Sequence, residues 1–342
     1  MAAFFSHLRI YEQKLSDMKF PKLLILLLMS SSFACNQTKT TEPPTASISN
    51  EQVSMKLYLP DPEHGYYRAT RFDWSGIIYS LEYGEHQYVG EWKNSHDPLV
   101  HEDLTGPAES YGDPGPGFEE AEIGGEFIRI GVGALEKSDE EYIWNKTYRI
   151  LDHGLWEVEQ GKDWIEFTHT MERESGWAYV YTKRIELMQD EPGFSMIHIL
   201  RNKGNKAIHT NQFNHNFFVM DQQVTGPDFS LEFPFNLSSE EYNAELVELE
   251  QNKLLIKKEL LKGEYIFLHL DGFGDSPEDN QVKIVNQKTG AGVQISVDKP
   301  LQKIVFWAIS TTLCPEPYIQ LDVAPGEKET WVSEYRLFNT RN

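Results

Sequence analysis

Two short segments hold side chains that can exchange protons with a ligand. His215 lies within residues 210–218, and Glu316 lies between Pro315 and Pro317. A carboxylate can accept a proton, and a histidine can donate or accept one near neutrality because its usual pKa is close to 6.5. The alternatives are a solvated glutamate in a proline-flanked loop and a buried structural histidine. If the fold brings the two residues together, they predict general acid–base chemistry.

Motifs of other catalytic chemistries are absent from the sequence. It contains no G-x-S-x-G elbow, no Walker loop and no H-E-x-x-H. Gly131-Val132-Gly133 lacks the third glycine of a dinucleotide site. We therefore expect neither a nucleotide cofactor nor a catalytic metal.

Three segments resemble patterns of the aldose 1-epimerase (galactose mutarotase) superfamily. In the first, a strand ending in Asn202-Lys203-Gly204 leads to a second strand that carries His215. In the second, residues 312–317 resemble the family's C-E-P segment and precede a Pro-Gly-Glu turn at residues 325–327. The third and weakest match is residues 65–72. The matches follow the family's order from about residue 57 to 338, which is nearly the whole predicted domain.

The resemblance implies roles for the two proton-exchanging residues. His215 matches the family's catalytic acid and Glu316 its catalytic base. Interconversion of sugar anomers removes a proton from the C1 hydroxyl and protonates the ring oxygen, so that the ring opens and recloses from the other face. One base and one acid suffice for this reaction, so the resemblance implies an isomerase without a cofactor or a metal.

The resemblance also implies residues that bind the sugar. Arg68 and Arg71 match a region in which an arginine approaches the hydroxyls. Asn214 and Phe217 flank His215, and Phe217, like Trp74 and Trp92, could stack on a pyranose. The family's H-G-G segment is absent, and His101 is the substitute that we expect. This departure puts galactose itself in doubt as the substrate.

The hydrophobic pattern predicts an all-β domain. Apolar residues recur with period two, which is typical of strands and not of amphipathic helices. We expect a galactose mutarotase-like supersandwich of antiparallel strands with few short helices. Residues 238–254 fit either a helix or a surface strand pair. The clearest strands are predicted at residues 164–171, 177–187, 282–287, 293–297, 303–310 and 330–338.

A long stretch rich in proline and glycine interrupts this rhythm at residues 96–122. Long irregular loops within a domain are commonly functional or disordered. We expect residues 101–120 to form one wall of the sugar site, with a disordered insertion as the alternative.

The N-terminus has the order of an exported lipoprotein. A basic stretch at residues 18–22 precedes seven apolar residues and then small residues that end at Cys35. We expect residues 1–35 to be a signal peptide, with residues 1–17 a misassigned start, and Cys35 to be lipidated. Residues 36–52 are expected to be a disordered tether and residues 53–342 the folded domain. The expected location is the periplasmic or outer side of a bacterial membrane, with ordinary secretion as the alternative.

The negative charge of the chain limits the classes of partner that it can bind. The formal net charge is −22. Such a surface repels phosphate backbones and anionic headgroups, so we expect no nucleic acid and no membrane contact except through the lipid anchor. The expected ligand is a small sugar or the terminus of a glycan, and the oligomeric state stays open.

Three functions fit these features. The first is an isomerase resembling aldose 1-epimerase. The second is a carbohydrate-binding surface lipoprotein without catalysis. The third is a glycan lyase or hydrolase on a related scaffold, although hydrolysis requires a second carboxylate that the sequence does not reveal next to Glu316.

Overall fold

The structure is a computed structural model that describes residues 42–341. The predicted signal peptide, its lipidated Cys35 and the first part of the predicted tether lie outside the described residues. Within residues 42–341, no helix is both long and apolar enough to cross a membrane.

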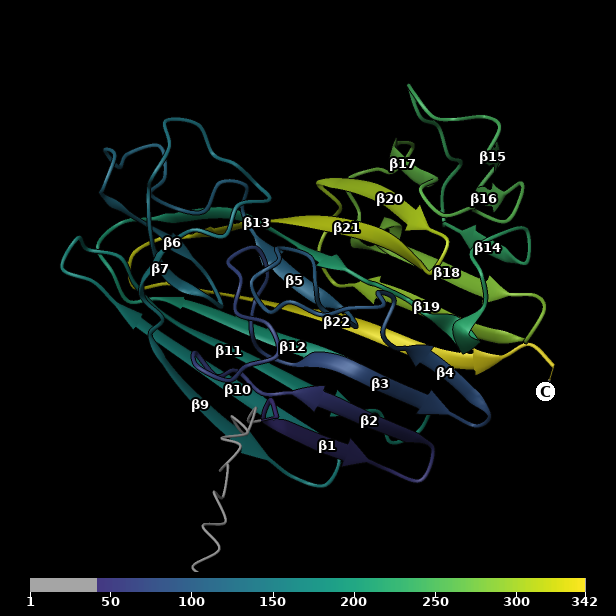
Figure 1. Cartoon of the computed structure of the whole chain (residues 1–342), viewed down its shortest axis with the longest axis horizontal. Coiled ribbons are helices and arrows are strands. Elements are labelled where there is room, and N and C mark those ends of the chain that lie inside the picture. Colours follow the sequence, from purple (N-terminus) through teal and green to yellow (C-terminus); the bar gives the residue numbers. More distant parts are fainter. Residues whose placement is uncertain (1–41, 342) are drawn as a thin grey trace, which may run out of the picture. The chain divides into compact units, whose positions relative to one another are not determined.

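A ten-stranded antiparallel sheet forms one layer of the domain (Figure 1). Its strand order is β15-β16-β14-β18-β19-β22-β12-β11-β10-β9. Along its central strands, buried and partly exposed residues alternate, as expected for a sheet with one face on a core. The bounds are β9 Leu155–Gln160, β10 Trp164–Glu172, β11 Ala178–Leu187, β12 Gly193–Asn202, β14 Phe229–Glu232, β15 Val247–Glu250, β16 Lys253–Ile256, β18 Gln281–Asn286, β19 Ala291–Val297 and β22 Lys328–Asn339.

Two further sheets form the layer that carries the predicted site. A five-stranded sheet has the order β17-β20-β21-β13-β5, and a four-stranded sheet has the order β1-β2-β3-β4. A bridge between Val89 and Phe218 links them. The bounds are β1 Thr45–Ser49, β2 Val53–Tyr58, β3 Ile77–Tyr83, β4 His86–Val89, β5 Ala108–Tyr111, β13 Ile208–His215, β17 Tyr265–Leu270, β20 Lys303–Ile309 and β21 Thr312–Val323.

Short elements complete the domain. A three-stranded sheet consists of β6 Glu126–Arg129, β7 Gly133–Glu136 and β8 Ile150–Asp152. Two 3-10 helices, η1 Met220–Gln222 and η2 Pro277–Asp279, are the helical segments of the described chain.

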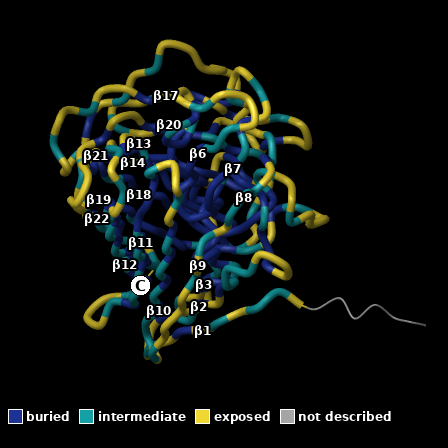
Figure 2. Tube along the Cα trace, turned by 90° about the vertical axis from the view of Figure 1, so that its left-hand side faces the viewer, coloured by how far each residue is buried: buried dark blue, intermediate teal, exposed yellow. Residues whose placement is uncertain are grey.

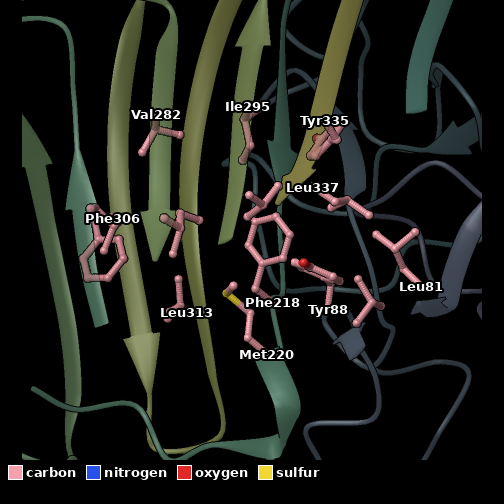
Figure 3. Packing of buried hydrophobic residues seen from close by; sticks show 14 of the residues in the cluster. Leu81, Tyr88, Phe218, Met220, Val282, Ile295, Phe306, Leu313, Tyr335 and Leu337 are labelled. Carbon is pink, nitrogen blue, oxygen red and sulfur yellow. The ribbon is translucent and has the colours of Figure 1, made fainter. Parts of the chain in front are cut away.

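The main hydrophobic core lies between the layers. Phe218 and Leu313 from the site layer and Ile295 and Leu337 from the large sheet belong to one buried cluster (Figure 3). A second cluster joins the five-stranded sheet to the large sheet through residues such as Trp331. Figure 2 shows this burial between the sheets, while exposed segments gather around β17. The packed core makes the site layer a rigid support.

The prediction of an antiparallel β-sandwich with few short helices is confirmed. The predicted hairpin at residues 282–297 is β18–β19, and residues 238–254 contribute to the strand pair β15–β16 instead of a helix.

Three strands lie where the sequence predicted irregular chain. β1 falls within the predicted tether, where it pairs with β2 and buries Ile48, so the disordered tether cannot extend to residue 52. β5 falls within the predicted loop 96–122 and pairs with β13. β21 runs through Pro315 and Pro317, between the predicted strands 303–310 and 330–338, where we had expected a loop that contains proline and glycine.

Candidate active site

Cross-strand register places His215 directly opposite Glu316. The ladder between β13 and β21 runs to Phe213 opposite Tyr318 and resumes at the bridge between Phe218 and Leu313. Residues in this register have numbers that add to the same value, so position 215 faces position 316. Directly opposite residues of an antiparallel pair project from the same face of the sheet.

The ladder opens at this position because two residues lack a backbone donor. The Leu313 N–H donates to Phe218 O on the β13 side. By strand alternation, positions 315 and 317 also face β13, and proline has no N–H to donate. Instead, the Asn216 side chain donates to Pro315 O at 2.6 Å. The prolines thus free a short window of both strands, and the window contains His215 and Glu316.

The two side chains are in direct contact and almost fully buried. His215 Nε2 lies 3.2 Å from Glu316 Oε1, and the side chains are 4% and 6% exposed. Burial raises the pKa of Glu316 to about 8, although the positive charges of Arg71 and Lys303 act in the opposite direction. Burial also lowers the pKa of His215 well below its usual value, and the charges of Arg71 and His101 add to this effect. Both shifts favour neutral groups, so the pair holds one exchangeable proton at neutral pH.

Aromatic rings fix the orientation of the His215 imidazole. The Phe217 ring stacks on it with centroids 3.9 Å apart. Phe72 and Trp307 approach edge-on, at 5.8 Å and 5.4 Å. These ring contacts hold the imidazole in one orientation.

The pair opens into a cavity of about 380 Å³, which is within the usual size of small-molecule sites. Its floor is the outward face of the five-stranded sheet, and its walls come from loops. The residues that line it are Arg71, Glu102, Trp144, His215, Tyr265, Phe267, His269, Lys303, Val305, Trp307, Glu316 and Tyr318.

Two cations line this cavity and form no ion pair within residues 42–341: Arg71 and Lys303. The Arg71 guanidinium lies 4.6 Å from the centroid of the Trp144 ring, and Lys303 Nζ lies 4.0 Å from that of Tyr318. The buried Arg129 holds Arg71 from behind, because its Nη2 donates to Arg71 O at 2.9 Å. The backbone of Arg71 is therefore anchored, and its guanidinium lies against the Trp144 ring at the cavity.

Two neighbours of His215 that we expected to bind the sugar do not line the cavity. Asn214 points to the opposite face of β13, where its Nδ2 donates to Tyr335 Oη at 2.8 Å. Strand alternation explains this, since adjacent residues project from opposite faces. Phe217 is fully buried and lies behind the imidazole. Trp74 and Trp92, the other expected platforms, are also buried in the core.

Two further expected residues lie outside the cavity. Arg68 lines a separate hollow together with Trp74 and Leu99. His101 lies next to the wall, with its ring 5.1 Å from that of Trp144, and its neighbour Glu102 lines the cavity instead. Of the predicted loop wall at residues 101–120, Glu102 is the residue that reaches the cavity.

Sequence reasoning missed the residues that complete the cavity. Lys303 and Trp307 alternate along β20, a strand that was predicted, and the register with β21 places them on the face of Glu316. Their alternation with the buried Ile304 and Phe306 was the available signal. Trp144 lies in a loop, and no pattern in the sequence marked it.

Comparisons with known proteins support the fold. No family model matches the chain, and no curated protein matches it in sequence. Solved structures match with 12% identity over 86% of this chain. A galactose mutarotase-like protein from Lactobacillus casei matches over 100% of its own length with a TM-score of 0.53. Putative aldose 1-epimerases from Escherichia coli and Klebsiella pneumoniae match over 99% and 79% of their lengths, with TM-scores of 0.52 and 0.54. The described part of the chain therefore has the galactose mutarotase-like fold.

Proposed function

We propose that this protein is a carbohydrate-active isomerase that interconverts the anomers of a sugar. The observation that carries the proposal is the His215–Glu316 pair, buried at the floor of a cavity with exposed aromatic walls. The fold supports it, since solved structures described as putative aldose 1-epimerases have the same architecture.

The direct contact between the two side chains fits this reaction. From the sequence we expected a water-width or sugar-width gap between His215 and Glu316, and the direct contact at 3.2 Å contradicts that expectation. No such gap is needed, because the C1 hydroxyl oxygen and the ring oxygen are both bonded to C1. An acid and a base that lie side by side can therefore reach both oxygens from one edge of the ring.

The single proton of the pair is sufficient for a complete turnover. Moving it from Glu316 to His215 gives the carboxylate base and imidazolium acid that the family resemblance implies. Glu316 then removes the C1 hydroxyl proton while His215 protonates the ring oxygen, and the C1–ring oxygen bond breaks to give the open aldehyde. After rotation about the C1–C2 bond, the same transfers run in reverse and restore both groups.

The cations of the cavity favour the carboxylate form of Glu316. Arg71 and Lys303 both lower the pKa of Glu316, so they stabilise its carboxylate. Burial opposes the transfer of the proton from Glu316 to His215, because it disfavours both charged groups. The pair therefore stays neutral until a sugar hydroxyl binds beside it. Arg71 and Glu102 are the side chains that we expect to bind the other hydroxyls.

Polarimetry tests the proposal directly. The purified protein should accelerate the equilibration of freshly dissolved anomers for at least one member of a panel of aldoses. His215→Asn and Glu316→Gln should abolish that acceleration while circular dichroism stays unchanged. If the wild-type protein accelerates no aldose but binds one in the cavity, the site is a binding site and not an isomerase site.

We also propose that the protein is exported and anchored through Cys35. The support is the order of basic, apolar and small residues before that cysteine. Cys35→Ala should move the protein from the membrane fraction to the soluble fraction. A variant that still sediments with membranes would contradict the anchor.

A further inference from the structure

Three hollows meet along the edge strand β17. The first is the cavity beside His215 and Glu316. The second, about 590 Å³, lies against residues 239–242, and the third, about 350 Å³, lies next to Tyr242 and Tyr265. Phe267 lines all three. The three hollows therefore adjoin one another at Phe267, and together they are here called the β17 groove, which begins at the candidate active site.

The exposed aromatic side chains of the described chain are concentrated in this groove. Among residues 42–341, the exposed aromatics are Trp144 at 49%, Tyr242 at 39%, Tyr265 at 63% and Phe267 at 53%. Each of the four lines one of the three hollows. Contiguous exposed aromatic surface marks a binding site, because water contact with such rings is unfavourable. Exposed aromatics without a shared function would be spread over the surface, whereas these four lie at adjoining hollows.

Strand geometry gives the groove a length greater than one sugar. Tyr265, Phe267 and His269 project from the same face of β17, since buried residues alternate with them. Residues two apart in a strand are separated by about 6.6 Å, so these three side chains extend over about 13 Å. The row lies opposite Ile309, Trp307 and Val305 of β20.

Unpaired carboxylates line the second hollow. Glu240, Glu241 and Asp271 belong to its wall, and none of them forms an ion pair within residues 42–341. Carboxylates accept hydrogen bonds from hydroxyl groups and repel other anions. This lining suits a neutral, hydroxyl-rich chain and opposes an anionic polymer. A pyranose has apolar faces that match aromatic rings and a polar rim that matches carboxylates.

We infer that the β17 groove binds a neutral oligosaccharide whose reducing end occupies the cavity at His215 and Glu316. This inference rests on the proposed isomerase activity for the orientation of the chain, because C1 must lie beside the acid–base pair. The following sugars then extend from the cavity past Phe267 towards Tyr242. The substrate class is thus the reducing end of an oligosaccharide instead of a free monosaccharide.

Calorimetric titration tests the groove. The probes are glucose and four neutral tetrasaccharides, namely cellotetraose, maltotetraose, laminaritetraose and mannotetraose. At least one tetrasaccharide should bind more than tenfold more tightly than glucose. Tyr242→Ala and Phe267→Ala should each weaken that tetrasaccharide roughly tenfold, because each removes apolar surface that the ligand covers. Tetragalacturonate should gain nothing over galacturonate.

A control variant and sedimentation show whether the groove binds sugar or a second copy of the chain. Leu155 is 60% exposed on β9 of the large sheet, outside the groove, and Leu155→Ala should leave every affinity unchanged. Tetrasaccharides that bind no more tightly than glucose would overturn the inference. A wild-type dimer that dissociates in Phe267→Ala during sedimentation would also overturn it, since the groove would then be covered by the second copy.

The result also separates the groove from the proposed activity. Tight tetrasaccharide binding that depends on Tyr242, without anomer exchange in the wild-type protein, supports the groove and contradicts the isomerase. If the protein exchanges monosaccharide anomers but binds tetrasaccharides no more tightly than glucose, the isomerase is supported and the groove is contradicted.

Discussion

Strands β13 and β21 carry two histidine–carboxylate pairs in the same register. His215 faces Glu316, and six residues away along each strand His209 faces Asp322 at 2.7 Å. Their environments differ: the His209 and Asp322 side chains are 70% and 59% exposed, whereas those of the site pair are almost fully buried. Water screens the exposed pair and stabilises its charges. The same geometry therefore becomes a site for proton exchange only where loops cover the sheet.

A third pair shows that burial alone is not sufficient. His198 Nε2 lies 2.6 Å from Glu109 Oε1, and both side chains are fully buried. Lys183 Nζ also contacts Glu109, at 2.6 Å. Burial would raise the pKa of Glu109, but the charges of His198 and Lys183 outweigh it and lower that pKa to about 2. Glu316 has no lysine in contact and opens into a cavity, so its proton stays exchangeable.

The largest expected effect on activity separates the two pairs on β13 and β21. His215→Asn and Glu316→Gln should each lower kcat for anomer exchange at least about 100-fold, because each removes one proton-transfer step. His209→Asn and Asp322→Asn are matched controls on the same strands and should change kcat less than about twofold. Polarimetric initial rates give all four values. Equal losses from both pairs would indicate damage to the strands instead of lost catalysis.

The second effect is on stability and concerns the fully buried His198–Glu109 pair and its neighbour Lys183. Lys183→Met should lower the free energy of unfolding by about 3–5 kcal/mol, because it leaves the buried Asp73 without its cation and leaves Glu109 with His198 alone. Urea denaturation measures this loss. Lys258→Met removes the lysine of a solvent-exposed pair with Glu264 and should leave the free energy of unfolding almost unchanged. A loss in Lys183→Met no larger than this would show that the core cluster is not electrostatically coupled.

The third effect is a stability gain that varies with pH. The pKa of Glu316 lies at about 8 in the folded protein, above its usual value of 4.5. Between these values the folded state binds more protons than the unfolded state, so Glu316 makes the protein less stable as pH rises. Glu316→Gln should become more stable than the wild type by up to about 1.4 kcal/mol per pH unit across this range. Thermal unfolding at pH 5 and pH 8 measures the change, and a constant difference would contradict the raised pKa.

The sequence predicted the fold class and the central pair because both depend on local patterns. Period-two alternation marks strands such as β10 and β11 wherever one face is buried. The pair became visible because His215 and Glu316 lie in short motifs. Their contact depends on cross-strand register, which the sequence alone did not provide.

The missed strands share a physical cause. β21 contains Pro315 and Pro317, which normally argue against a central strand. It forms nonetheless, because it stays paired with β20 along this stretch, and the missing N–H groups leave only a short gap in its ladder with β13. All four residues of β5 are buried, including Glu109, so no alternation marked it within the proline-rich stretch. Lys183, which pairs with Glu109, is distant from it in sequence, and no local pattern predicts the pairing.

Predictions of sugar-binding residues were wrong where the face of the sheet, and not the position in the sequence, decides whether a side chain reaches the cavity. Asn214 lies next to His215 in sequence but on the other face of the sheet. Residues from other strands, such as Trp307, line the cavity instead because register brings them to the same face.

The pH dependence of kcat/KM for anomer exchange is the sharpest test of the buried pair, because it reports the protonation of the free enzyme. The pair must hold one proton. We predict that kcat/KM falls as pH rises through about 8, where Glu316 loses that proton. We also predict that activity persists at pH values below 6.5, because the pKa of His215 is lowered. A rate that instead falls below pH 6.5 and stays constant above pH 8 would contradict a single proton shared by His215 and Glu316.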